Sequence, residues 1–167
     1  MRTIEDRQRL AFEENLARYY FRDLEVYNRR GNSYYTVWIR YKEYKNSYKL
    51  RLELSEHLMH SEPSLFVESP KTLWLYQYKG TINDLGTSYY YHVHRNDDPN
   101  RFVKICFTDD WNSDYTYIFA LHRGKIWIAA YEVHLLTGKT IAEIINEWKD
   151  KLKKQGELNK SGTQIFI

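Results

Sequence analysis

The sequence predicts an α+β domain: an N-terminal helix, an antiparallel meander of four or five strands, and C-terminal helices. Two observations support this fold class. Apolar residues near both ends of the chain recur at helical spacing. Between them, apolar and polar residues alternate as they do in half-buried strands. Because no linker or repeat interrupts the chain, we expect one domain over residues 1–155 and a tail over residues 156–167.

The predicted N-terminal helix runs from about Ile4 to Arg29, and Gly31-Asn32 marks its end. Its apolar stripe comprises Leu10, Ala17, Phe21 and Leu24. Alternation then predicts a hairpin of two strands, which run from Tyr35 to Tyr41 and from Tyr48 to Leu54.

Shorter strand-like runs follow the hairpin. They are Ser64 to Glu68, Leu73 to Tyr78, Ser88 to His94 and Phe102 to Phe107. Helical spacing returns from Asn112 to Leu136, where Gly124 leaves open whether one helix or two form. Thr140 and Glu143 stand at the spacing of a capping box and predict a final helix.

Length and cysteine content limit the class of protein. A chain of 167 residues fits one domain. A single cysteine cannot form an internal disulfide, which is typical of a reducing compartment. The charged start, MRTIEDRQRL, has no apolar signal core, and no apolar run approaches the ~18 residues of a membrane span. We therefore expect a cytoplasmic protein that does not associate with a membrane.

The net charge of +3 comes from interspersed charges, so we expect no direct binding to nucleic acid. Tyrosines at positions 89–91 could stack on bases, but Tyr-rich runs are more often strands. One basic cluster near the C-terminus is interpreted as the solvated end of a helix. Its members are Lys149, Lys151, Lys153 and Lys154.

Cys106 is the first candidate for chemistry. It lies in the apolar run VKICF, and a cysteine in such a run is usually an inert, buried residue. The polar residues that follow, Thr108-Asp109-Asp110, indicate that the strand reaches the surface within two residues. An exposed thiolate at that point could act as a nucleophile.

His92 and His94 precede Cys106 and would point the same way if both lie on one strand. An imidazole there could polarise the thiol or stabilise an oxyanion. The pair could instead be half of a zinc site with His57 and His60, although no second cysteine favours it. A third interpretation is that both histidines lie at the surface and have no function. No phosphate-binding loop is present, so we expect no cofactor.

The order of these motifs resembles the ubiquitin-conjugating enzyme fold. YKLRLELSEHLMHSEPSLFVESP is similar to the family's second-to-third strand passage, and VKICF resembles the segment that carries its catalytic cysteine. The stretch from Trp111 through WIAAYEVHLLTGK resembles a bacterial branch found in anti-phage conjugation operons, including those with a cyclic-oligonucleotide synthase (CBASS systems). The eukaryotic His-Pro-Asn motif is replaced by Asp98-Pro99-Asn100, which leaves the oxyanion role of Asn100 open.

The resemblance implies that Cys106 accepts the C-terminus of a ubiquitin-like protein or of a cyclic-oligonucleotide synthase as a thioester. The acyl group then passes to an amine. His94 or His92 would polarise the thiol, and Asp109 would position or deprotonate the amine. This chain offers no adenylation site, and the resemblance leaves open whether a separate activating enzyme supplies the donor. The alternative is an inactive, protein-binding adaptor of the same fold with a buried Cys106.

Overall fold

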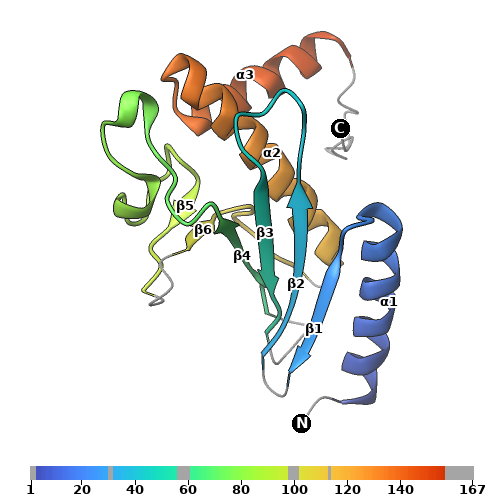
Figure 1. The fold of residues 1–167 in the computed structure, drawn as a ribbon. Helices are drawn as coiled ribbons and strands as arrows, with labels where there is room; N and C mark the ends of the chain where they lie inside the picture. The colour runs from blue at the N-terminus through green and yellow to red at the C-terminus, as the bar shows by residue number, and fades with distance from the viewer. Residues whose placement is uncertain (1–2, 30–31, 56–60, 98–101, 113, 157–167) are drawn as a thin grey trace.

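The computed structural model describes residues 3–29, 32–55, 61–97, 102–112 and 114–156. It confirms the α+β class: α1 (Ile4–Tyr20) precedes an antiparallel six-stranded sheet, and α2 (Tyr117–Thr137) and α3 (Ile141–Lys154) follow it. Helix α2 crosses behind the sheet, α1 stands beside its first strand, and α3 lies across the top (Figure 1). Apart from Gly156, the predicted tail over residues 156–167 lies outside the described residues.

The strands of the sheet stand in the order β1-β2-β3-β4-β6-β5. Their bounds are Glu25–Arg29, Asn32–Ile39, Tyr48–Glu53, Ser64–Ser69, Val93–His94 and Val103–Ile105 for β1 to β6. The predicted hairpin is confirmed as β2 and β3, in which Val37 pairs with Leu50. Alternate residues of β3 are buried because its apolar side chains face α2.

The prediction that the first helix continues to Arg29 is wrong. Helix α1 begins with a capping box between Thr3 and Asp6 and ends at Tyr20, where Phe21 adopts an extended conformation. Residues 25–29 form β1, which pairs with β2. Phe21 and Leu24 are buried in the turn between α1 and β1. Their helical spacing therefore reflects burial rather than a helix.

Two other strand-like runs do not form the predicted strands. Within the first, Trp74 makes one isolated bridge to Thr81 and Tyr76–Tyr78 form a 3-10 helix, η1. A second 3-10 helix, η2, follows at Ile82–Asp84. In the second run only Val93–His94 pair as a strand. Three tyrosines of these runs lie at the surface, Tyr78 (66% exposed), Tyr89 (74%) and Tyr90 (66%), whereas Tyr91 packs against the core.

The main core lies between α2 and the sheet. Its fully buried members include Trp127, Leu50, Leu52, Leu65, Leu121 and Ile128. Helix α2 is one helix, with Thr116 as its N-cap and a left-handed Gly138 as its C-cap. The predicted capping box of Thr140 and Glu143 begins α3. No helix among the described residues has the length and apolar character needed to span a bilayer.

Candidate active site

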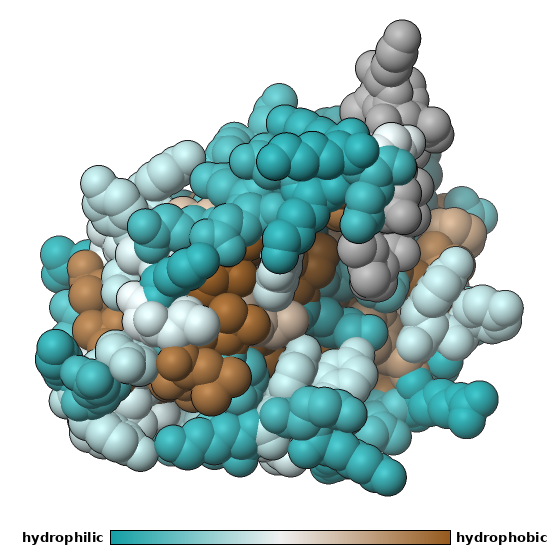
Figure 2. Space-filling view, turned by 90° about the horizontal axis from the view of Figure 1, so that it is seen from above, coloured by the Kyte–Doolittle hydropathy of each residue, from teal (hydrophilic) through white to brown (hydrophobic). Residues whose placement is uncertain are grey.

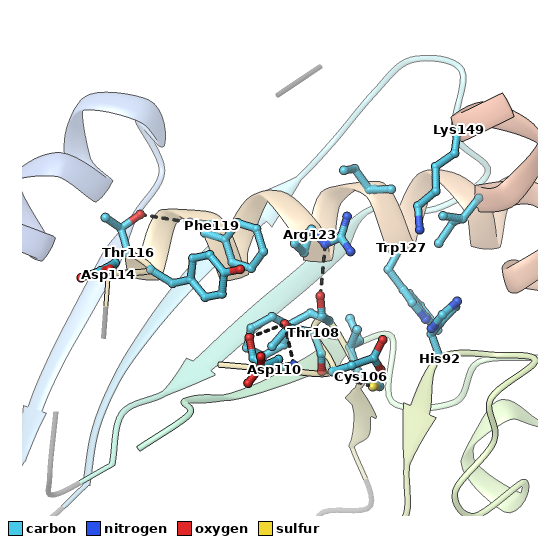
Figure 3. A pocket seen from close by; sticks show the side chains of 16 residues that line it. His92, Cys106, Thr108, Asp110, Asp114, Thr116, Phe119, Arg123, Trp127 and Lys149 are labelled. Carbon is cyan, nitrogen blue, oxygen red and sulfur yellow. Dashed lines mark hydrogen bonds between the residues drawn. The ribbon is translucent and has the colours of Figure 1, made fainter. Parts of the chain in front are cut away.

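Cys106 directly follows β6 and lines a cavity of about 610 Å³ between the sheet and helices α2 and α3 (Figure 3). Its amide donates to the His92 carbonyl oxygen at 2.8 Å, which fixes the backbone against the turn before β5. The side chain is half-buried. Its thiol donates to the carbonyl oxygen of Thr108 at 3.7 Å. The sulfur therefore borders a space large enough for a ligand.

The predicted polar turn after Cys106 is confirmed. The Thr108 hydroxyl accepts a hydrogen bond from the Asp110 amide at 3.2 Å, as in an ST turn. Asp109 and Asp110 are exposed at this turn and line the cavity. The strand thus surfaces where the sequence predicted.

His92 lies on the same cavity because both C-terminal helices hold its turn, residues 89–92. The Trp127 indole in α2 donates to the Tyr91 carbonyl oxygen at 2.9 Å. The Ala142 amide at the start of α3 donates to the Tyr90 carbonyl oxygen at 2.9 Å. His92 itself has a left-handed backbone with φ of 48°, which is uncommon for a residue other than glycine.

The prediction that His92 and His94 share one strand is wrong. His92 belongs to the turn, whereas His94 pairs with Lys104 in the β5–β6 ladder. His94 lines a different, smaller cavity of about 350 Å³. The left-handed backbone at His92 breaks the alternation on which the prediction rested. Of the two histidines, only His92 lines the same cavity as Cys106.

The structure adds two cations that the sequence did not single out, Arg123 of α2 and Lys149 of α3. The Arg123 Nε donates to the Phe107 carbonyl oxygen at 3.1 Å, and its guanidinium carbon lies 5.7 Å from the centre of the Phe119 ring. Lys149 was interpreted as part of a solvated basic cluster. It is exposed, as that interpretation requires, and it also extends from α3 toward the cavity (Figure 3).

The other three lysines of the basic cluster match the interpretation. Lys151, Lys153 and Lys154 are exposed in the last turn of α3. Seen from above, hydrophilic residues cover much of the surface and border a group of hydrophobic ones (Figure 2). These three side chains complement the negative end of the helix dipole.

Helical spacing could have found both cations. Phe119, Arg123 and Trp127 follow one another at intervals of four residues, and all three line the cavity. Lys149 follows Ile145 by four residues, and Ile145 also lines the cavity. A charged residue on the inner stripe of a helix is therefore the signal to look for.

The thiol of Cys106 is held in its neutral form. Burial raises its pKa above the ordinary value, and the nearby carboxylates of Asp109 and Glu62 raise it further. The Arg123 guanidinium acts in the opposite direction and lowers the pKa. The thiolate is therefore a minor species at neutral pH.

His92 is a neutral imidazole at pH 7. Burial lowers its pKa, and the positive charge of Lys149 lowers it further. Burial likewise lowers the pKa of Lys149, with a second contribution from Arg123. The two cations therefore lie near each other in a partly desolvated setting, and Asp109 is the carboxylate that offsets them.

The described residues include no group of three or more His, Cys, Asp and Glu side chains placed to hold a metal ion. His57 and His60, the other half of the zinc hypothesis, lie outside the described residues, as do Asp98, Pro99 and Asn100. The cavity instead offers a thiol, a neutral base and two cations. Such a set suits attack on a carbonyl group, because cations stabilise the oxyanion that forms.

The chain was compared with protein-family models, with curated proteins and with solved structures, and none of them matches it. The resemblance to ubiquitin-conjugating enzymes therefore stays a prediction from the residues.

Proposed function

We propose that this chain is a ubiquitin-conjugating-like acyl carrier that forms a thioester on Cys106. One observation carries the proposal: the sulfur lines a cavity together with the neutral base His92 and the cation Arg123. The motif order of the sequence supports the same function. In this proposal the donor is the C-terminus of a ubiquitin-like protein or of a cyclic-oligonucleotide synthase, and a separate enzyme activates it. The setting is the bacterial cytoplasm, in anti-phage defence.

The transfer requires two displacements at one carbonyl carbon. In the first, His92 takes the thiol proton and the sulfur of Cys106 attacks the donor thioester. A new C–S bond forms, the old C–S bond breaks, and the donor thiol leaves with a proton. In the second, an amine attacks the Cys106 thioester, the C–N bond forms and the bond from the acyl carbon to the Cys106 sulfur breaks. The proton that the amine loses restores the Cys106 thiol. Arg123 would stabilise the oxyanion in both steps.

The second candidate, a non-catalytic adaptor, is favoured by a different observation. The Cys106 thiol is kept protonated and already donates to the Thr108 carbonyl oxygen. An inert cysteine would have these properties. The adaptor predicts that native Cys106 resists iodoacetamide, whereas the acyl carrier predicts that it reacts.

The acyl-carrier proposal is tested with the 2-mercaptoethyl thioester of N-acetylglycine and intact-mass measurement. We expect an acetylglycyl adduct that dithiothreitol removes, and no adduct in Cys106→Ala. Cys106→Ser should give an ester that resists the reductant. An unchanged adduct in Cys106→Ala would end the proposal.

A pair of histidine variants locates the base. His92→Asn, in which asparagine tolerates the left-handed backbone, should slow adduct formation by about 100-fold, at the lower end of general base catalysis. His94→Ala should react as the wild type does, because His94 lines the other cavity. Equal rates for His92→Asn and wild type would remove His92 from the mechanism.

A further inference from the structure

We propose that the cavity beside Cys106 binds an apolar group, carried by the acyl residue that the sulfur accepts. Four large apolar side chains line this cavity and remain partly exposed, and together they form its apolar wall. They are Tyr115, just before α2, Phe119 and Ile126 of α2, and Ile145 of α3. Folding ordinarily removes such surface from water. A ligand that covers the apolar wall completes this burial.

The apolar wall extends along α2. Phe119 and Ile126 are seven residues apart, which is close to two helical turns, so both lie on one side of the helix about 10 Å apart. The Tyr115 ring stacks on the Phe119 ring, with centroids 4.5 Å apart and planes inclined by 11°. Phe119 and Trp127 point from α2 toward the segment that carries Cys106 (Figure 3). Helix geometry and ring packing thus hold the apolar wall beside the sulfur.

Charge does not decide which group enters the cavity. The lining carries three carboxylates, from Asp109, Asp110 and Asp114, and two cations, from Arg123 and Lys149. Lys149 and the three aspartates are exposed, so water and salt screen them. Arg123 already donates to a backbone carbonyl oxygen. An uncharged, apolar group therefore enters without leaving a charge unpaired, and it gains free energy from the surface that it buries.

This inference deepens the proposed function and rests on it for the identity of the reacting molecule. Once the thioester forms, the acyl carbon is bonded to the Cys106 sulfur, so the side chain next to that carbon lies at the cavity. A cavity of about 610 Å³ has room for a leucine or phenylalanine side chain. The substrate class is thus an acyl donor whose terminal residue is large and apolar. Glycine is a poorer terminal residue, because it leaves the apolar wall in contact with water.

The test measures alkylation of the full chain by two uncharged reagents, iodoacetanilide, which carries a phenyl ring, and iodoacetamide, which does not. Cys106 is the only cysteine, so each rate reports on one sulfur. Both reagents form a C–S bond with the thiolate and release iodide, so the ratio of their rates cancels any change in the pKa of Cys106. Relative to the urea-unfolded chain, the ratio should favour iodoacetanilide by about tenfold, the factor for burying roughly 55 Å² of apolar surface. The preference should persist in about 1 M salt, which screens charges but not apolar contacts.

Variants of the apolar wall decide the result. Phe119→Ala and Ile126→Ala each remove part of the apolar surface, so each should bring the ratio to within about threefold of that of the unfolded chain. Ile126→Ala deletes the smaller side chain, so it remains informative if Phe119→Ala fails to fold. Val133→Ala is the matched control, because Val133 is also a partly buried apolar residue of α2 but lies outside the cavity lining. It should keep the wild-type ratio.

Two thioesters then identify the group that occupies the site. Relative to the unfolded chain, the 2-mercaptoethyl thioester of N-acetylphenylalanine should acylate folded Cys106 faster than that of N-acetylglycine. Phe119→Ala and Ile126→Ala should reduce this difference, and Val133→Ala should not. Equal relative rates for the two thioesters would overturn the assignment of the site to the acyl residue.

A folded alkylation ratio equal to that of the unfolded chain, or one that neither Phe119→Ala nor Ile126→Ala lowers, overturns the apolar site. So does a folded Cys106 that reacts with neither reagent, because the cavity then does not admit a phenyl ring. If the apolar site fails while the acetylglycyl adduct still forms, the acyl carrier stands. A preference for iodoacetanilide without any acyl adduct would instead reject the acyl carrier and leave the apolar site standing.

Discussion

The Cys106 thiol lies among charges of both signs, and their balance sets how readily it ionises. Burial, Asp109 and Glu62 all raise its pKa, while Arg123 lowers it. The carboxylate turn and the guanidinium come from different elements, so each can be changed without the other. The reactivity of this one sulfur therefore reports on the charges around it.

Removing the Asp109 charge and removing the Arg123 charge should shift the pH dependence of Cys106 alkylation in opposite directions. Asp109→Asn removes a carboxylate that raises the thiol pKa, so its profile should move to lower pH than the wild type. Arg123→Gln removes a cation that lowers the pKa, so its profile should move to higher pH. The measurement is the iodoacetamide rate from pH 7 to 10.5.

Asp110→Asn is the matched control, because Asp110 is the neighbouring cavity-lining carboxylate but not one that raises the Cys106 pKa. Its profile should overlay that of the wild type. Profiles that shift together in Asp109→Asn and Arg123→Gln would show that the two charges do not act on the sulfur as described.

At the scale of residues, the sequence located Cys106 and its polar turn because both are local features of one segment. It could not choose between His92 and His94. The choice depends on a left-handed turn that Trp127 and Ala142 hold from helices far along the chain. Lys149 is exposed, as the sequence indicated, but its place beside the cavity was missed for a related reason. In a run of lysines, only the packing of the helix shows which one borders a cavity.

Helix α2 continues without a break through Gly124, which answers the question of one helix or two. A Cβ at Gly124 would lie 2.8 Å from a Leu50 methyl carbon and 3.0 Å from one of Leu65. Both leucines are fully buried in the sheet. The glycine therefore permits close approach of the helix to β3 and β4 rather than ending the helix.

Gly124→Ala should not give the ~1 kcal/mol that alanine normally adds to a helix. Overpacking of a full core costs about 1–3 kcal/mol, so we expect the free energy of unfolding to fall by up to about 2 kcal/mol. Urea denaturation measures it. In a Leu50→Ala background, which makes room beside Gly124, the same substitution should become less destabilising or stabilising. Additive effects of the two substitutions would contradict this account.

Elements with a strong local period were predictable, and those fixed by distant contacts were not. The alternation of apolar and polar residues predicted β3, and the spacing of a capping box predicted the start of α3. Strand β1 was missed because Phe21 and Leu24 continue the helical spacing of α1 while being buried in a turn. The tyrosine-rich runs near Tyr78 and Tyr89 have strand propensity, but Tyr78, Tyr89 and Tyr90 remain at the surface.

At the scale of the molecule, His134 joins the end of α2 to two other segments. The side chain is buried, with 1% exposure. Its Nε2 accepts a hydrogen bond from the Tyr76 amide at 3.0 Å, so the proton is on Nδ1, which donates to the Lys139 carbonyl oxygen at 2.6 Å. The rings of Tyr91 and Tyr131 pack against it. This arrangement requires a neutral imidazole, because a protonated Nε2 cannot accept.

His134 should make the whole fold less stable in mild acid. Burial lowers its pKa in the folded state, so below about pH 6.5 the unfolded chain binds the proton that the folded chain excludes. The free energy of unfolding is therefore intact above that pH and declines below it, by up to about 1.4 kcal/mol per pH unit for this one group.

Urea denaturation between pH 7.5 and 5 measures the effect of His134. His134→Gln, whose amide oxygen can accept from Tyr76, should be less stable than wild type at pH 7.5 but should lose less stability as the pH falls. Parallel stability profiles for the two proteins would rule out His134 as a source of the acid sensitivity.

The short strand β5 has a consequence for how this molecule associates with others. An open sheet edge normally exposes amide and carbonyl groups that recruit a further strand, from a partner or from another copy. Here Val93 exchanges both of its outer backbone hydrogen bonds with Ser88, at 2.9 and 3.1 Å, and the Arg95 amide donates to the Thr87 hydroxyl at 3.0 Å. The chain thus seals its own edge on the side of Cys106. A partner protein on that side must therefore bind through side chains rather than by strand addition. The same arrangement protects the edge from aggregation with other copies of the chain.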